Sequence, residues 1–95
     1  GWVCVEAMAA GRPVICLDLG GPALQVTEET GFKLPVCTPE QVVDEMAKAM
    51  LILAQDADLR AKMGWAGRKR VRKEFLWEYR AELITNIYRV VIENK

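Results

Sequence analysis

Apolar and polar residues alternate along the chain with two different periods, which predict helices and strands in the order of an α/β unit. Residues 1–10 are mostly small and apolar and end at Gly11, which is typical of a helix stopped by glycine. The run 14–19, VICLDL, is apolar with β-branched members, as in a parallel strand covered on both faces. The run 32–36, FKLPV, predicts a second strand, and Pro35 places it near an edge or at a strand end.

Two short segments connect these elements. Arg12 and Pro13 form a turn before the first strand, and a diglycine, Gly20-Gly21, follows it. Residues 22–26 fit one helical turn, and residues 27–31 are polar and turn-like.

Three longer helices are predicted in the second half of the chain. Thr38 is placed to cap the first of them, with Gln41 completing a capping box, and Asp56 is placed to cap the second. The last helix covers residues 77–92, and its apolar face is wider than one neighbouring helix would cover. The core-facing stripes are predicted at Val43, Met46, Met50 and Leu53 in the first helix and at Leu59, Met63, Gly67, Val71 and Phe75 in the second.

Two strands with three long helices are too few for a complete doubly wound sheet, which has about five or six strands. We therefore expect residues 1–95 to be the C-terminal part of an α/β domain, truncated at its N-terminus. The fold class is α/β and partly Rossmann-like, with two short parallel strands followed by three long helices.

The amino-acid composition excludes several kinds of functional site. The 95 residues include 13 basic and 13 acidic side chains, so the chain as a whole has no field that attracts nucleic acid or an anionic membrane. Histidine is missing from the sequence, which excludes imidazole acid–base chemistry and histidine-based metal sites. The cysteines, Cys4, Cys16 and Cys37, lack metal-type spacing and are interpreted as reduced thiols of a cytoplasmic protein. No apolar run approaches the ~20 residues of a membrane span.

Glu6 is a lone carboxylate among small and apolar residues, just before a buried strand. A carboxylate accepts two hydrogen bonds at once, which suits the paired 2′ and 3′ hydroxyls of a ribose. The start of its helix offers free backbone N–H groups, which suit phosphate. The diglycine after the strand allows a ligand to approach the backbone closely. A solvated surface glutamate and a simple glycine turn are the plain alternatives.

The stretch VEAMAAGRPVICLDLGGPALQVTEETGFKLPV closely resembles the C-terminal domain of the group 1 glycosyltransferases, the retaining family 4 enzymes of GT-B fold. Their donor-site segment has the form Glu-x7-Glu, E-G-F-G-x-x-x-x-E-A-M-A-x-G-x-P-V-I, followed by a strand and a G-G-P loop. LILAQDADLRAKMGWAGRKRV and EFLWEYR resemble the usual ending of these enzymes. The resemblance covers essentially all of the chain in the right order.

The resemblance implies a donor site with residues from the segments before and after the first strand. Glu6 matches the second glutamate, which in the family binds the ribose of the sugar nucleotide. Gly1, Trp2 and Val3 match the helix start that faces the diphosphate, and the loop near the donor corresponds to Gly20 and Gly21. The family's first glutamate would precede Gly1, and Leu24 stands where many members have glutamate, so no role is carried onto it.

The resemblance implies that the parent protein transfers a sugar from a nucleotide-diphosphate-sugar donor to a hydroxyl acceptor. It implies no metal and no cofactor, the nucleotide sugar being the substrate, and no catalytic residue is assigned within this chain. The acceptor is expected to bind a missing N-terminal domain, against which the last helix packs in the family. The chain alone is predicted to be inactive.

Three alternatives stay open. A non-catalytic helical packing or assembly module would self-associate through the exposed edge strand and the last helix. A GT-B phosphorylase or epimerase would keep the fold but change the reaction. The run 68–73, RKRVRK, is interpreted as the solvated face of a helix, with peripheral membrane contact of the parent protein as the alternative and nucleic acid disfavoured.

Overall fold

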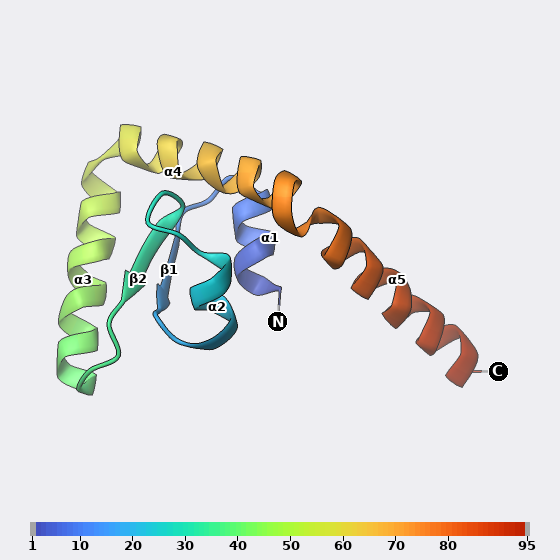
Figure 1. Ribbon diagram of the computed structural model, residues 1–95. Coiled ribbons are helices and arrows are strands. Elements are labelled where there is room, and N and C mark those ends of the chain that lie inside the picture. Colours follow the sequence, from blue (N-terminus) through green and yellow to red (C-terminus); the bar gives the residue numbers. More distant parts are fainter. Residues whose placement is uncertain (1, 95) are drawn as a thin grey trace.

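Two parallel strands lie beside a set of helices, and a long helix runs outward from them (Figure 1). The computed structural model describes residues 2–94. Its elements are, in order, α1 Val3–Ala9, β1 Val14–Leu17, α2 Gly20–Gln25, β2 Gly31–Leu34, α3 Pro39–Gln55, α4 Ala57–Arg70, the π-helix η1 Val71–Phe75 and α5 Leu76–Glu93. The predicted α/β fold class, with two short parallel strands and three long helices, is confirmed.

The strands β1 and β2 pair in parallel through the crossover helix α2, with Val14 opposite Gly31 and Leu17 opposite Leu34. Both end sooner than predicted, β1 at Leu17 instead of residue 19 and β2 at Leu34 instead of residue 36. Pro35 follows β2 at once and has no N–H to give to a ladder. Gly31 is required at its position, because a Cβ atom there would overlap backbone atoms of Val14.

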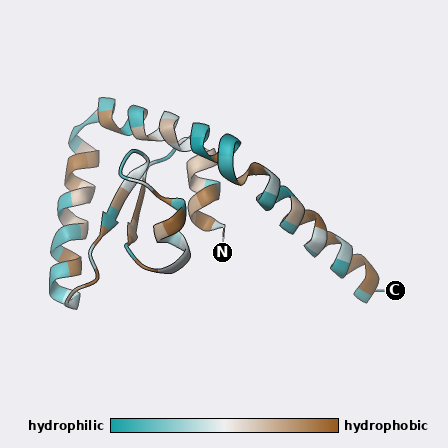
Figure 2. Ribbon diagram, viewed as in Figure 1, coloured by the Kyte–Doolittle hydropathy of each residue, from teal (hydrophilic) through white to brown (hydrophobic). Residues whose placement is uncertain are grey.

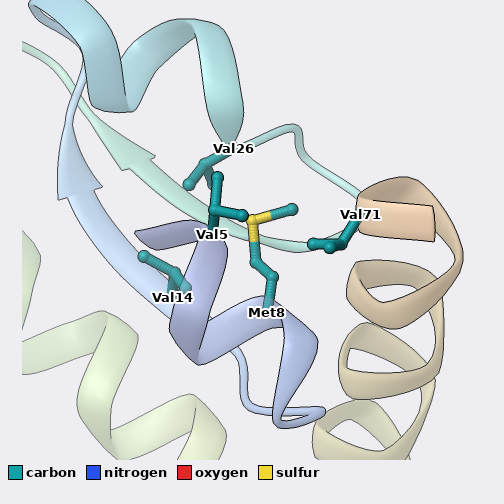
Figure 3. Close-up of a cluster of buried hydrophobic side chains, with 5 residues drawn as sticks. All are labelled: Val5, Met8, Val14, Val26 and Val71. Atoms are coloured by element: carbon teal, nitrogen blue, oxygen red, sulfur yellow. The ribbon is translucent and has the colours of Figure 1, made fainter. Parts of the chain in front are cut away.

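The buried core joins side chains from α1, β1, the residue after α2 and η1 (Figure 3). Met8 and Val26 have no exposed surface, and Val5 is 1% exposed. Full burial of an apolar side chain of this size contributes about 1.5–3 kcal/mol. Since Val5 and Met8 both come from α1, this burial fixes which face of α1 points inward.

The predicted end of the first helix is confirmed. Gly11 has a φ of +74°, the left-handed conformation that glycine adopts easily, and its N–H donates to the Met8 carbonyl over 2.9 Å. The helix itself is shorter than predicted, running from Val3 to Ala9.

Both predicted helix caps are confirmed. Thr38 Oγ1 accepts a hydrogen bond from the backbone N–H of Gln41 over 3.3 Å at the start of α3. Asp56 Oδ1 accepts from the backbone N–H of Leu59 over 2.9 Å at the start of α4. Each cap satisfies one of the amides that a helix start leaves unpaired.

The stripe predicted for α4 is confirmed, whereas the one predicted for α3 is largely wrong. Along α4 and η1, Met63, Gly67 and Val71 are buried. On α3 the buried residue is Ala49. The predicted core residues Val43, Met46 and Met50 are exposed, and Leu53 is half-buried. Residues of α3 are apolar on two sides, so periodicity located an apolar side but not the side that packs against β2 and α4.

The helices α4, η1 and α5 follow one another without a break, and η1 is a feature that the sequence did not predict. The buried stripe advances in steps of four residues, and each such step drifts by about 40° around an α-helix. A π-helical turn holds more residues than an α-helical turn and so reduces the drift. Val71 and Phe75 therefore both lie against the core cluster.

Arg70 ties this helix to the segment after β1. Its Nε donates to the carbonyl of Gln25 over 2.8 Å, and its Nη2 donates to the carbonyl of Leu24 over 2.9 Å. Its Nη1 pairs with Glu74 over 2.8 Å. The guanidinium thus uses three separate N–H donors, a geometry that lysine does not offer.

The helix α5 extends away from the strands (Figure 1) and buries none of its residues. Its apolar side chains are exposed, as the wide apolar face of the sequence indicated. The exposed large apolar side chains of α5 are Trp77, Leu83, Ile84, Ile87, Tyr88, Val90, Val91 and Ile92.

Candidate functional site

Glu6 lies in α1, on the side of the helix opposite the core. Its neighbours Val5 and Met8 are buried, whereas the Glu6 side chain is exposed. The hydroxyl of Tyr79, at the start of α5, donates a long hydrogen bond of 3.4 Å to Glu6 Oε1. The carboxylate therefore keeps acceptor positions on both oxygens for a ligand, while one oxygen is oriented by the tyrosine.

An aromatic cluster supports this arrangement. The ring of Trp2 meets Phe75 edge-to-face at a centroid distance of 6.5 Å and Tyr79 at 6.0 Å. The indole N–H of Trp2 also donates to a carboxylate oxygen of Glu82 on α5. Edge-to-face pairs of this kind add about 0.5–1.5 kcal/mol to the burial of the rings. The start of α1 is thus held against the first turns of α5.

Within residues 2–94, no side chain caps the backbone amides at the start of α1. Trp2 occupies the N-cap position and makes no side-chain hydrogen bond to the helix amides. Val3, the next residue, is 77% exposed. Gly1, also predicted to contribute to this helix start, lies outside the described residues.

Gly20 and Gly21 do not form the predicted loop but begin α2. Gly20 has a φ of +63°, which favours glycine, and a Cβ atom at either glycine would meet nothing within 4 Å. Open space therefore lies next to both residues. Within the described residues, no neighbouring atom is close enough to Gly21 to exclude a larger residue at this position.

The fold brings these separate residues to one end of the sheet. Since α1 leads through a tight turn into β1, the start of α1 lies near the end of β1, where α2 also begins (Figure 1). The helices α1 and α2 are in contact. This is the carboxyl end of the parallel strands, where open α/β sheets bind their ligands.

Residues 2–94 show no metal site, no activated cysteine and no membrane-spanning helix. His, Cys, Asp and Glu side chains in this range form no group of three that would hold a metal ion. Burial raises the pKa of the Cys4 thiol, and burial together with the neighbouring Cys4 raises that of Cys16. Both thiols are therefore poor nucleophiles. No helix in this range combines the length and apolar character that crossing a membrane requires.

The model of the family "Glycosyl transferases group 1" matches residues 1–70. The chain belongs to the group 1 glycosyltransferases. The resemblance of the sequence to this family is thereby confirmed, and the two parallel strands with long helices are consistent with part of its GT-B domain.

Curated relatives of this glycosyltransferase chain are much longer than the chain itself. The GDP-mannose-dependent monoacylated alpha-(1-6)-phosphatidylinositol monomannoside mannosyltransferase of Corynebacterium glutamicum is 39% identical over 92% of the chain and 22% of the relative. The alpha-maltose-1-phosphate synthase of Mycolicibacterium smegmatis is 35% identical over 96% of the chain and 24% of the relative. Alpha-1,3/1,6-mannosyltransferase ALG2 of Homo sapiens is 37% identical over 79% of the chain and 17% of the relative. The chain thus spans about a fifth of the length of these relatives, and no solved structure matches it significantly.

Sequence reasoning singled out Glu6 and the start of α1 but missed the residues that contact them. Tyr79 touches Glu6 although 73 residues separate the two in the sequence. The only signal was the four-residue spacing of Phe75 and Tyr79, which places both rings on one side of a helix.

Proposed function

We propose that this chain is part of the nucleotide-sugar-binding domain of a retaining glycosyltransferase. The complete protein transfers a sugar from a nucleotide-diphosphate-sugar donor to a hydroxyl acceptor. The single observation that supports this most is the family match over residues 1–70, which contains the exposed carboxylate of Glu6. The chain's small share of its relatives' length is consistent with a domain segment.

In this proposal Glu6 binds the ribose of the donor. Its exposed carboxylate lies in the first turn of α1, after Trp2 and Val3, and within residues 2–94 no side chain caps the amides of this turn. A nucleotide with its diphosphate at these amides would place its ribose further along the helix. The phosphates gain from the positive end of the helix dipole. Gly20 and Gly21, with open space next to them, lie near the diphosphosugar.

The test is donor kinetics in the complete glycosyltransferase polypeptide. GDP-mannose is the first donor to try, since the relative with 39% identity carries it in its name. Hydrogen bonds to a charged group are worth about 1.5–3 kcal/mol, so Glu6→Ala should lower kcat/KM for the donor about 10- to 100-fold.

The matched control is Glu28→Ala. Glu28 is an exposed glutamate in the turn before β2, at the opposite end of the sheet from the start of α1. It should leave donor kinetics unchanged. Equal kinetics in the Glu6 variant and the parent enzyme would contradict the ribose role.

The 95 residues alone are proposed to be inactive, because no catalytic residue and no acceptor site are assigned to them. Sugar transfer by the purified chain would contradict this statement.

Self-assembly is a second candidate function, favoured by one observation. The exposed side chains of α5 include Ile84, Ile87 and Val91, which lie on one side of a helix that nothing within residues 2–94 covers. Sedimentation of the purified chain separates the two candidates. A stable oligomer without nucleotide affinity supports assembly, whereas a monomer that binds GDP or UDP supports donor binding.

A further inference from the structure

Basic residues are concentrated in one stretch of an otherwise neutral chain. Residues 60–73, RAKMGWAGRKRVRK, contain seven of the 13 basic side chains and no carboxylate. They cover most of α4 and the start of η1. The helix α4 runs along the outer edge of the molecule (Figure 1), and its C-terminal end is largely hydrophilic (Figure 2).

Two of these cations serve the fold itself. Arg60 donates to the carbonyls of Leu53 and Ala54 at the end of α3. Arg70 bonds to the carbonyls of residues 24 and 25 and to Glu74. Structural demands therefore explain these two residues but not the remaining ones.

Four other cations and a tryptophan line a surface hollow of about 560 Å³, and no carboxylate lines it. We call these residues the basic face. They are Trp65, Arg68, Lys69, Arg72 and Lys73.

Trp65 and Lys69 of the basic face point away from the core, whereas Arg68 borders the turn after α1. Trp65 and Lys69 each lie two residues, about 200° around the helix, from the buried Met63 and Gly67. Trp65 is 67% exposed, which is unusual for a large aromatic side chain. The Nζ atom of Lys69 lies 5.2 Å from the centre of the Trp65 ring.

Within residues 2–94, no ion pair joins a basic-face cation to a carboxylate. Arg68 reaches the carbonyl of Ala10 over 3.4 Å, whereas Lys69, Arg72 and Lys73 donate to no protein acceptor in this range. An adjoining hollow, which Trp65, Lys69 and Lys73 also line, carries the carboxylates of Glu29 and Glu74.

We propose that the basic face docks the protein onto an anionic lipid surface. Lysine and arginine side chains are attracted to the negative potential of such a surface, and an exposed tryptophan sits favourably at the level of the headgroups. A helix lying flat along the membrane presents cations and an aromatic ring together. Binding to single-stranded nucleic acid would instead use several aromatic rings in series, and the basic face offers Trp65 alone.

This docking is compatible with donor binding. The basic face borders the C-terminal end of α1, where Arg68 donates to the Ala10 carbonyl, whereas the proposed donor site lies at the N-terminal end of α1. The inference therefore goes beyond the proposed function and does not depend on it.

The experiment is flotation of the full chain with phosphatidylcholine vesicles, with and without phosphatidylserine. One triple variant removes three cations of the basic face, and a control removes three exposed cations elsewhere, so both have the same net charge. The test variant carries Lys69→Gln, Arg72→Gln and Lys73→Gln. The control carries Arg12→Gln, Lys48→Gln and Arg89→Gln.

Each cation near an anionic surface contributes about fivefold to the partition coefficient, so the test variant should bind phosphatidylserine vesicles on the order of a hundredfold more weakly. The control should bind like the parent chain, and added salt should weaken both. Circular dichroism checks that both variants are folded. In the parent chain, vesicles with brominated phosphatidylserine should quench tryptophan fluorescence, and Trp65→Phe should remove most of that quenching.

Three results would overturn the proposal. The two triple variants could lose binding equally, which would make the effect one of net charge. The parent chain could bind vesicles with and without phosphatidylserine alike, which would assign the binding to the apolar side of α5. The chain could fail to bind vesicles but bind single-stranded RNA through the basic face, which would identify the basic face as a nucleic-acid-binding surface.

Discussion

Gly64 is the position where one added methyl group should cost the most. Alanine in a helix interior normally gains about 1 kcal/mol over glycine. At Gly64, however, the new Cβ atom would overlap the carbonyl oxygen of Gly11 and lie 2.9 Å from its carbonyl carbon. These are backbone atoms of the turn that joins α1 to β1, so they cannot turn aside as a side-chain end would.

The turn has little freedom to retreat. Gly11 is held by its N–H bond to the Met8 carbonyl, and the Met8 side chain is fully buried beneath it. Forcing extra volume into such a contact costs about 1–3 kcal/mol. Because the overlap is with backbone, we take the upper end of that range, about 3 kcal/mol. Alanine regains about 1 kcal/mol through its higher helix propensity, so Gly64→Ala should lower the free energy of unfolding by about 2 kcal/mol.

The assay is urea unfolding followed by far-UV circular dichroism, with Gly21→Ala as the control. A Cβ atom at Gly21 meets nothing within 4 Å, so this variant should be as stable as the parent chain or up to about 1 kcal/mol more stable. If Gly64→Ala were as stable as the parent chain, the close approach of α4 to this turn would be refuted.

Two further changes test other contacts. Arg70→Lys should lower the free energy of unfolding by about 1–2 kcal/mol, because the three N–H donors of lysine share one nitrogen and cannot reach the acceptors that Nε, Nη1 and Nη2 of Arg70 bind. The exposed Arg72→Lys should stay within about 0.5 kcal/mol in the same assay. Iodoacetamide should label the exposed Cys37 before Cys4 and Cys16. Burial raises the pKa of the latter two, so less of each is thiolate at a given pH and their labelling should accelerate only at more alkaline pH; equal rates in the folded chain would contradict this.

Local signals in the sequence predicted local structure well. A cap such as Thr38 or a stop such as Gly11 acts on amides and carbonyls within a few residues, so the residue types alone indicate the helix end. The stripe of α4 was equally predictable, because Met63, Gly67 and Val71 form one row of small and apolar residues in a segment rich in charged side chains.

Features that depend on distant residues were not readable in the same way. The contact of Tyr79 with Glu6 depends on how η1 directs α5, and no periodicity encodes that direction. On α3, apolar residues occur on two sides, and the exposed Met46 and Met50 show that amphipathic spacing alone does not choose the packed side. The sequence also did not decide the structure of the diglycine Gly20-Gly21, since glycine after a strand is equally compatible with a loop and with a helix start.

The ribose role of Glu6 is the central claim, and a double-mutant cycle with the ligand tests it most directly. The measurement is the dissociation constant of GDP and of 2′,3′-dideoxy-GDP for the complete glycosyltransferase and its Glu6→Gln variant. If Glu6 binds the ribose hydroxyls, Glu6→Gln should weaken GDP about tenfold or more and leave the affinity of the dideoxy nucleotide nearly unchanged. An equal loss of affinity for both nucleotides would contradict the claim.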